Sequence, residues 1–159
     1  MYLAAVGDLP YNIVLIAHIF TAIAAFAPAF TYPIVTRISK DLGTEAQGSL
    51  LGSLNGSRRG QAIMLVATGV LGFALQGISE GQWSFGQAWL ILAIIVWVLM
   101  NAALHALIIP NERKMADGDS GAAGLAGIGG AAFSILLIVM LYLMVFKPGF
   151  DLSPSLGLI

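Results

Sequence analysis

Few side chains in the long apolar stretches of this chain could take part in chemistry. Its two histidines, His18 and His105, both lie in such stretches, and a neutral imidazole is a common ligand for haem iron and for other metal-bearing groups. The absence of cysteine excludes disulfides and thiolate metal sites. The candidate cofactors are therefore haem or a chlorophyll-type pigment, bound through His18 or His105.

The other polar or helix-distorting residues of these stretches suit packing better than catalysis. None is a carboxylate, which disfavours a proton-driven transporter and carboxylate-based hydrolysis. No nucleophile–base–orienter set, metal-ligand cluster or phosphate loop occurs, so we expect no enzyme, no catalytic residue and no metal site. The candidates for helix packing and a polar interior are Thr21, Pro28, Tyr32, Pro33, Thr68, Gly69, Gly72, Gln76, Asn101 and Ser134.

The elements that carry these residues are four stretches without any Asp, Glu, Lys or Arg. A hydrocarbon core of about 30 Å requires roughly 20 apolar residues in a helix. The composition, 58% hydrophobic and 9% charged, leaves too little polar surface for a water-soluble fold. We therefore predict an all-α integral membrane four-helix bundle, one domain over 1–159, with spans at about 12–35, 61–79, 88–109 and 128–146.

The seven cations indicate the orientation of these spans. Six lie in the two connections that follow the first and third spans, whereas one follows the fourth span. Since cytoplasmic loops carry the excess of Lys and Arg, both termini are predicted to face outward. The six are Arg37, Lys40, Arg58, Arg59, Arg113 and Lys114, and the single one is Lys147.

The connections also carry local signals. Thr44 to Gln47 has the pattern of a capping box, which predicts a helix-like cytoplasmic loop over 44–58. Its glycines recur every fourth residue and would form a smooth strip on a helix, although a flexible connector explains them equally well. Pro110 should end the third span, with a loop over 111–128, and the outer tail over 147–159 should be irregular.

Helical spacing places the polar groups on three faces that should turn inward, because polar groups facing lipid would lack partners. His18 and His105 would both lie on such faces, but at different depths. At 1.5 Å per residue they lie roughly 9 and 25 Å below the outer boundary. One haem iron therefore cannot be ligated by both, whereas separate sites remain possible.

Two prolines lie in the inner half of the first span. Pro28 and Pro33 remove the helical hydrogen bonds to the carbonyls of Ala24 and Ala29, so a kink is expected. Broken helices often line substrate sites in transporters. A small transporter or channel is therefore an alternative to a simple packing kink.

The run LIAHIFTAIAAFAPAFTYPI and the closing LMVFKPG resemble an uncharacterised family of small bacterial integral membrane proteins, filed as a domain of unknown function. The resemblance implies a bacterial inner-membrane location and a bundle of four helices, but no activity. A looser similarity, limited to His18 early in the first span, extends to membrane proteins that handle copper or haem.

The leading functional hypothesis is a non-enzymatic small membrane subunit or scaffold. Small residues outnumber chemically competent ones on the apolar helices, which favours packing against a second copy or a larger membrane complex. A respiratory or photosynthetic electron-transport complex is a plausible host. The partners expected are the lipid bilayer and other membrane proteins, without nucleic acid. The alternatives are a haem- or pigment-binding protein and a small transporter.

Overall fold

A computed structural model describes residues 6–39 and 44–149, and every regular element in these two ranges is helical. Three of the elements, α3, η1 and α4, follow one another without a break and form one long helix. The bounds are α1 Leu9–Ser39, α2 Thr44–Gly77, α3 Ala88–Ala102, the π-helix η1 Ala103–Ile108, α4 Ile109–Ala116, the short 3-10 helix η2 Ser120–Ala122 and α5 Ala123–Phe146.

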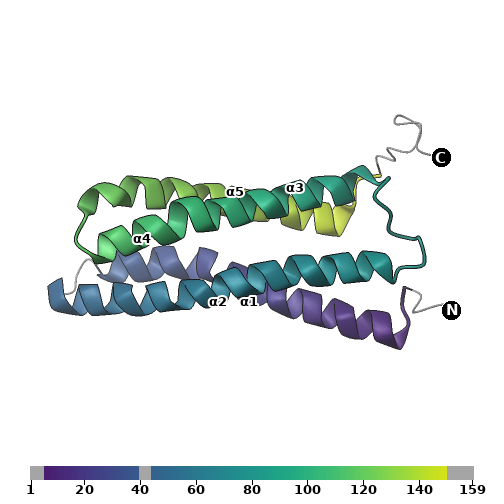
Figure 1. Cartoon of the computed structure of the whole chain (residues 1–159), viewed down its shortest axis with the longest axis horizontal. Helices are drawn as coiled ribbons and strands as arrows, with labels where there is room; N and C mark the ends of the chain where they lie inside the picture. Colours follow the sequence, from purple (N-terminus) through teal and green to yellow (C-terminus); the bar gives the residue numbers. More distant parts are fainter. Residues whose placement is uncertain (1–5, 40–43, 150–159) are drawn as a thin grey trace.

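The helices form two antiparallel pairs that pack side by side (Figure 1). One pair is α1 with α2, and the other is α3–η1–α4 with α5. The start of α1, the end of α5 and the α2–α3 connection all lie at one end of the bundle. The predicted all-α class with four long helices is confirmed, and each helix is long and apolar enough to cross a membrane.

Each of the four long helices extends beyond its predicted span at one end or at both. The predicted helical loop over 44–58 is the first part of α2, which runs without interruption into the apolar segment Gly56–Gly77. The capping-box side chains of Thr44 and Gln47 lie outside the described residues, as do Lys40 and the tail over 150–159. The fourth apolar helix begins at Ala123, five residues before the predicted span at 128–146.

The expected stop at Pro110 is wrong, since the helical path continues to Ala116. Proline in a helix clashes with the carbonyl four residues earlier and lacks an amide proton. Here the turn before Pro110 widens into the π-helix, in which the Ile109 amide bonds to the Leu104 carbonyl, five residues back. The widened turn accommodates the proline ring, so the helix continues as α4 where a loop was predicted.

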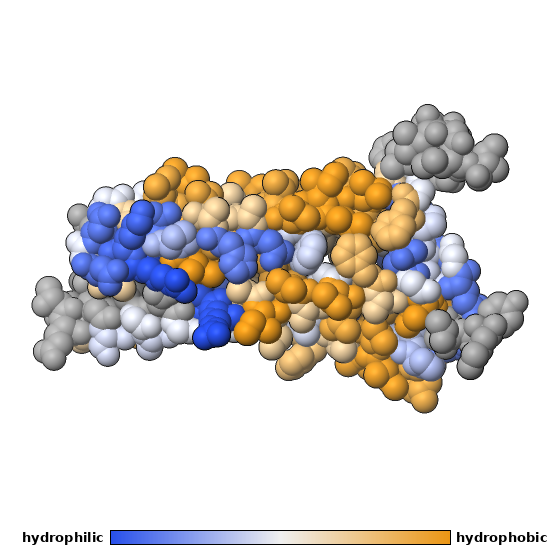
Figure 2. Space-filling view, viewed as in Figure 1, coloured by the Kyte–Doolittle hydropathy of each residue, from blue (hydrophilic) through white to orange (hydrophobic). Residues whose placement is uncertain are grey.

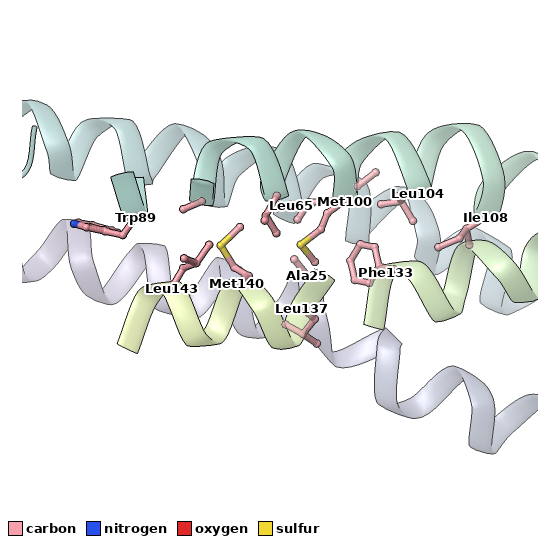
Figure 3. Packing of buried hydrophobic residues seen from close by; sticks show 13 residues of the cluster. Ala25, Leu65, Trp89, Met100, Leu104, Ile108, Phe133, Leu137, Met140 and Leu143 are labelled. Atoms are coloured by element: carbon pink, nitrogen blue, oxygen red, sulfur yellow. The ribbon is translucent and has the colours of Figure 1, made fainter. Parts of the chain in front are cut away.

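The core lies between the two pairs and consists of long apolar side chains that meet small ones. Leu65 of α2, Met100 of α3, Leu104 of η1 and Phe133 of α5 are nearly or fully buried and point into the same interior (Figure 3). α1 contributes only Ala25 to this cluster. In its most apolar window 6% of residues are buried, against 28 to 33% in the other three helices. α1 is therefore a peripheral helix that packs mainly on α2.

An aromatic group closes the bundle at the end where α1 begins. The Trp83 indole donates a hydrogen bond to the Tyr11 hydroxyl (2.9 Å) and meets Trp89 edge-on at 5.4 Å. The Lys147 ammonium, just after α5, lies 4.1 Å from the Trp83 ring centre. This tryptophan end thus joins α1, the α2–α3 connection, α3 and α5 through four side chains.

Candidate functional site

The opposite end of the bundle holds a buried ion pair. Arg58 of α2 and Glu112 of α4 form a bidentate pair, with Nε 2.9 Å from Oε2 and Nη2 2.7 Å from Oε1. The two side chains are 6% and 5% exposed. We call this region, where α1 ends, α2 begins and α4 lies, the charged end. The pair joins the two helix pairs of the bundle across their interface.

Two further residues complete the surroundings of Arg58. Its Nη1 donates to the side-chain oxygen of Gln61 (2.6 Å), and its guanidinium lies 4.0 Å from the ring centre of Tyr32 on α1. Tyr32 also interacts with the Glu112 carboxylate. Planar guanidinium groups stack on aromatic rings and form fork-shaped hydrogen bonds with carboxylates, and Arg58 does both. The cluster therefore unites α1, α2 and α4.

Gln61 links this cluster to the proline kink of α1. Its Nε2 donates to the Ala25 carbonyl at 3.0 Å. This carbonyl is next to that of Ala24, whose helical donor is removed by Pro28. α1 changes direction along its length in Figure 1, and Gln61 holds it where the helical hydrogen bonding is weakened. Gln61 thus ties α2 to α1 next to the carbonyl that Pro28 leaves without its helical donor.

A hollow of about 350 Å³ opens beside the ion pair. Arg59 and Arg113 are exposed at its edge, and no described residue forms an ion pair or hydrogen bond with either side chain. His105, expected on an inward face, is exposed and belongs to the same hollow. The lining residues are Arg58, Arg59, Ala62, His105, Ile109, Pro110 and Arg113.

His18 lies far from this hollow, in the α1–α2 interface. Its Nδ1 is 2.9 Å from the Thr68 carbonyl, and its ring packs against Gly72. A carbonyl only accepts, so in the neutral imidazole Nδ1 carries the proton and Nε2 keeps its lone pair. Nε2 has no hydrogen-bond partner among the described residues, and it is not sealed inside the protein. The two histidines therefore occupy separate places.

Most other polar candidates bond to their own helix. The acceptors are carbonyls three or four residues earlier in the chain, a common arrangement for hydroxyl and amide groups in apolar helices. Each of these side chains therefore has a hydrogen-bond partner within its own helix. They are Thr21 to His18 (2.9 Å), Thr68 to Met64 (2.8 Å), Asn101 to Trp97 (2.9 Å) and Ser134 to Gly130 (3.0 Å).

The remaining candidates on α2 mediate contacts with other elements. Gly69 lies directly under the Trp97 indole, where a Cβ would overlap the ring, and Trp97 donates to the Leu65 carbonyl at 2.8 Å. Gln76 donates to the Trp83 carbonyl at the tryptophan end (3.2 Å).

The last candidate, Pro33, lies on α1 rather than on α2. It is exposed, one turn beyond Ala29.

Sequence reasoning missed the ion pair because Arg58 and Glu112 were assigned to aqueous loops. A signal was available, since the predicted topology placed both next to span ends on the same side of the membrane. An opposite-charge pair at such a border could have been proposed. What the sequence could not show is that α2 and α4 extend beyond the apolar segments and bury the two side chains between them.

Comparison with protein-family models, with curated proteins and with solved structures found no match to this chain.

Proposed function

We propose that the four helices cross a membrane, with the charged end on the cytoplasmic side and both chain termini outside. Arg37, Arg58, Arg59, Arg113 and Lys114 belong to the charged end, whereas Lys147 lies at the other end. The positive-inside rule supports this orientation. The resemblance to small bacterial membrane proteins supports the bacterial cytoplasmic membrane as the location.

The surface between the two ends suits a lipid environment. Orange, hydrophobic atoms cover most of the visible face between the ends (Figure 2). Ile16 and Phe20 on α1 and Ile138 on α5 are each 68% exposed. Water-soluble monomers rarely expose apolar surface of this extent. The helices and their outward-facing side chains are those expected of a multi-pass membrane protein.

Within the membrane, we assign the chain a non-enzymatic role as a small subunit or scaffold that packs against other helices. The supporting observation is a division among its helical glycines. Gly69, Gly72 and Gly129 each contact a side chain of a neighbouring helix. Seven other described helical glycines face open space, with no neighbouring group within 4 Å of the place that a methyl group would occupy: Gly52, Gly56, Gly60 and Gly77 on α2, and Gly124, Gly127 and Gly130 on α5.

Glycine within a helix costs up to about 1 kcal/mol relative to alanine. The internal glycines offset this cost by allowing close packing, but the open ones gain nothing from the chain itself. Exposed small residues at such spacing allow a second helix to approach closely. A helix of another membrane protein, or of a second copy, is the occupant we propose for these surfaces.

Disulfide cross-linking tests this role, and the natural lack of cysteine makes single-cysteine variants straightforward. Gly56→Cys should form a cross-linked species in native membranes under mild oxidation. Ile16→Cys, at an equally open position on α1 without neighbouring glycines, should not. The size of the product distinguishes a second copy from a different protein. A protein that stays monomeric with both variants would contradict the assignment.

A second candidate function is pigment or haem binding through His18. The observation that favours it is the protonated Nδ1 held by the Thr68 carbonyl, because metal-ligating histidines are usually oriented in this way. The absorption spectrum of the purified wild-type protein tests it. A band lost in His18→Leu and kept in His105→Leu would support this function, and a colourless protein that stays colourless with added haem would exclude it.

A further inference from the structure

The hollow at the charged end carries an excess of positive charge. Arg58, Arg59 and Arg113 line it, and the Glu112 carboxylate beside it uses both oxygens to bind Arg58. Three guanidinium groups therefore face one carboxylate. Like charges gathered beside an apolar region repel one another, and this repulsion is weakly screened where water is scarce. A bound anion would relieve it.

The ion pair also fixes the arrangement of the hollow. Arg58 is held by Glu112, Gln61 and Tyr32 and cannot turn away. Arg59 follows it on α2, and Arg113 follows Glu112 on α4. The Arg58–Glu112 pair therefore fixes α2 and α4 relative to each other, and with them the positions of Arg59 and Arg113. A site that is organised before binding loses less entropy when the ligand arrives.

The chemistry of the lining favours phosphate. Guanidinium groups bind phosphate oxygens through paired, charge-assisted hydrogen bonds. Ala62, Ile109 and Pro110 add apolar surface to the lining of the hollow. The volume of about 350 Å³ falls within the range of small-molecule sites, about 300 to 1,000 Å³. The hollow can therefore hold a phosphate group together with a small attached moiety.

The position of the hollow matches the phosphate layer of a membrane. It adjoins the start of the apolar segment Gly56–Gly77 of α2, and blue, hydrophilic surface borders directly on orange surface in this part of the molecule (Figure 2). Beyond Arg59, exposed residues continue along the same face of α2 at helical spacing, namely Ile63, Val66 and Val70. An acyl chain could lie along this strip while its headgroup reaches Arg59.

We propose that this hollow is a binding site for a phosphate group, supplied by the headgroup of an anionic phospholipid or by a free phosphate. Basic pockets between helices on the cytoplasmic side of membrane proteins bind anionic lipid headgroups by the same physics. The site extends the role of the chain beyond helix packing, and does not depend on the glycine surfaces.

Binding of two probes to the purified full-length protein in a neutral detergent tests the proposal. The probes are short-chain phosphatidic acid and inorganic phosphate, each titrated at constant ionic strength and followed by a change in melting temperature and by native mass spectrometry. The altered protein is the double variant Arg59→Gln/Arg113→Gln. The matched control is Arg37→Gln/Lys114→Gln, which removes two exposed cations of the charged end that do not line the hollow.

The wild-type and control proteins should bind at least one probe, and Arg59→Gln/Arg113→Gln should bind it about tenfold or more weakly. Phosphatidic acid alone would identify a lipid site, and inorganic phosphate alone or equally would identify a site for the free anion. Equal loss of affinity in both double variants would indicate a general charge effect and overturn the proposal. Failure of the wild-type protein to bind either probe would overturn it as well, whatever its oligomeric state.

Discussion

Arg58 and Glu112 meet through two parallel hydrogen bonds of 2.9 and 2.7 Å, although 54 residues separate them in sequence. Burial of both charges is costly, and their attraction compensates for it only when the geometry is good and the other polar atoms have partners. Both conditions hold here, because Gln61 accepts from Nη1 and Tyr32 covers the guanidinium face. The pair also connects two helix pairs that otherwise share mainly apolar contacts.

Removal of one partner of this pair should destabilise the protein strongly. We expect Glu112→Gln to lower the free energy of unfolding in detergent by about 3 to 5 kcal/mol, because Arg58 would remain buried without a counter-charge. Denaturant unfolding followed by circular dichroism measures the loss. Arg59→Gln, at the neighbouring exposed position, should change it by less than about 0.5 kcal/mol.

The double variant Arg58→Leu/Glu112→Leu provides a separate check. It removes both buried charges together, so its loss should be clearly smaller than that of Glu112→Gln. If the double variant were as unstable as Glu112→Gln, the unpaired buried charge of Arg58 would not be the cause of the lost stability.

The contact between Gly69 and Trp97 predicts strict size selection at position 69. Gly69→Ala should destabilise the protein by about 1 to 3 kcal/mol, since the new methyl group must displace the indole that bonds to the Leu65 carbonyl. Thermal unfolding in detergent reports the change. Gly130→Ala is the matched control, as no neighbouring group lies within 4 Å of its Cβ position. There the better helix propensity of alanine should leave stability unchanged or raise it by up to about 1 kcal/mol.

The two histidines should differ in their contribution to stability. His18→Leu removes the bond to the Thr68 carbonyl and should cost about 0.5 to 1.5 kcal/mol, in the range of interhelical hydrogen bonds in membrane proteins. His105→Leu alters an exposed side chain without such a bond and should cost less than about 0.5 kcal/mol. Both are measured by denaturant unfolding. A larger loss for His105→Leu than for His18→Leu would be inconsistent with the described interface.

The proposed orientation can be tested with single cysteines in the two connections. Gln82→Cys, in the exposed α2–α3 connection, should react with a membrane-impermeant maleimide on intact spheroplasts. Ala116→Cys, exposed at the end of α4, should react only after the membrane is permeabilised. The reverse pattern would place the charged end outside, against the positive-inside rule.

Much of the fold follows from the sequence alone. Uncharged apolar stretches long enough to cross a membrane must form helices there, because every backbone amide and carbonyl then finds a partner within its own segment. The number of long helices and their alternating direction follow from this local requirement. The two groups of cations can also be read directly from the sequence. The same holds for the kink expected in the first helix, because it depends on two nearby residues, Pro28 and Pro33.

The tertiary structure decided what could not be local. Whether Pro110 ends a helix depends on a π-helical turn that can accommodate it, and the composition around Pro110 does not specify this turn. Which glycines are used depends on the side chain that faces them, so Gly69 and Gly56 look alike in sequence but differ in contact. The burial of Arg58 with Glu112 required two helices from distant parts of the chain to meet. Residue type determines what chemistry a side chain can do, whereas packing determines which groups it contacts. At the charged end, packing therefore determines the site.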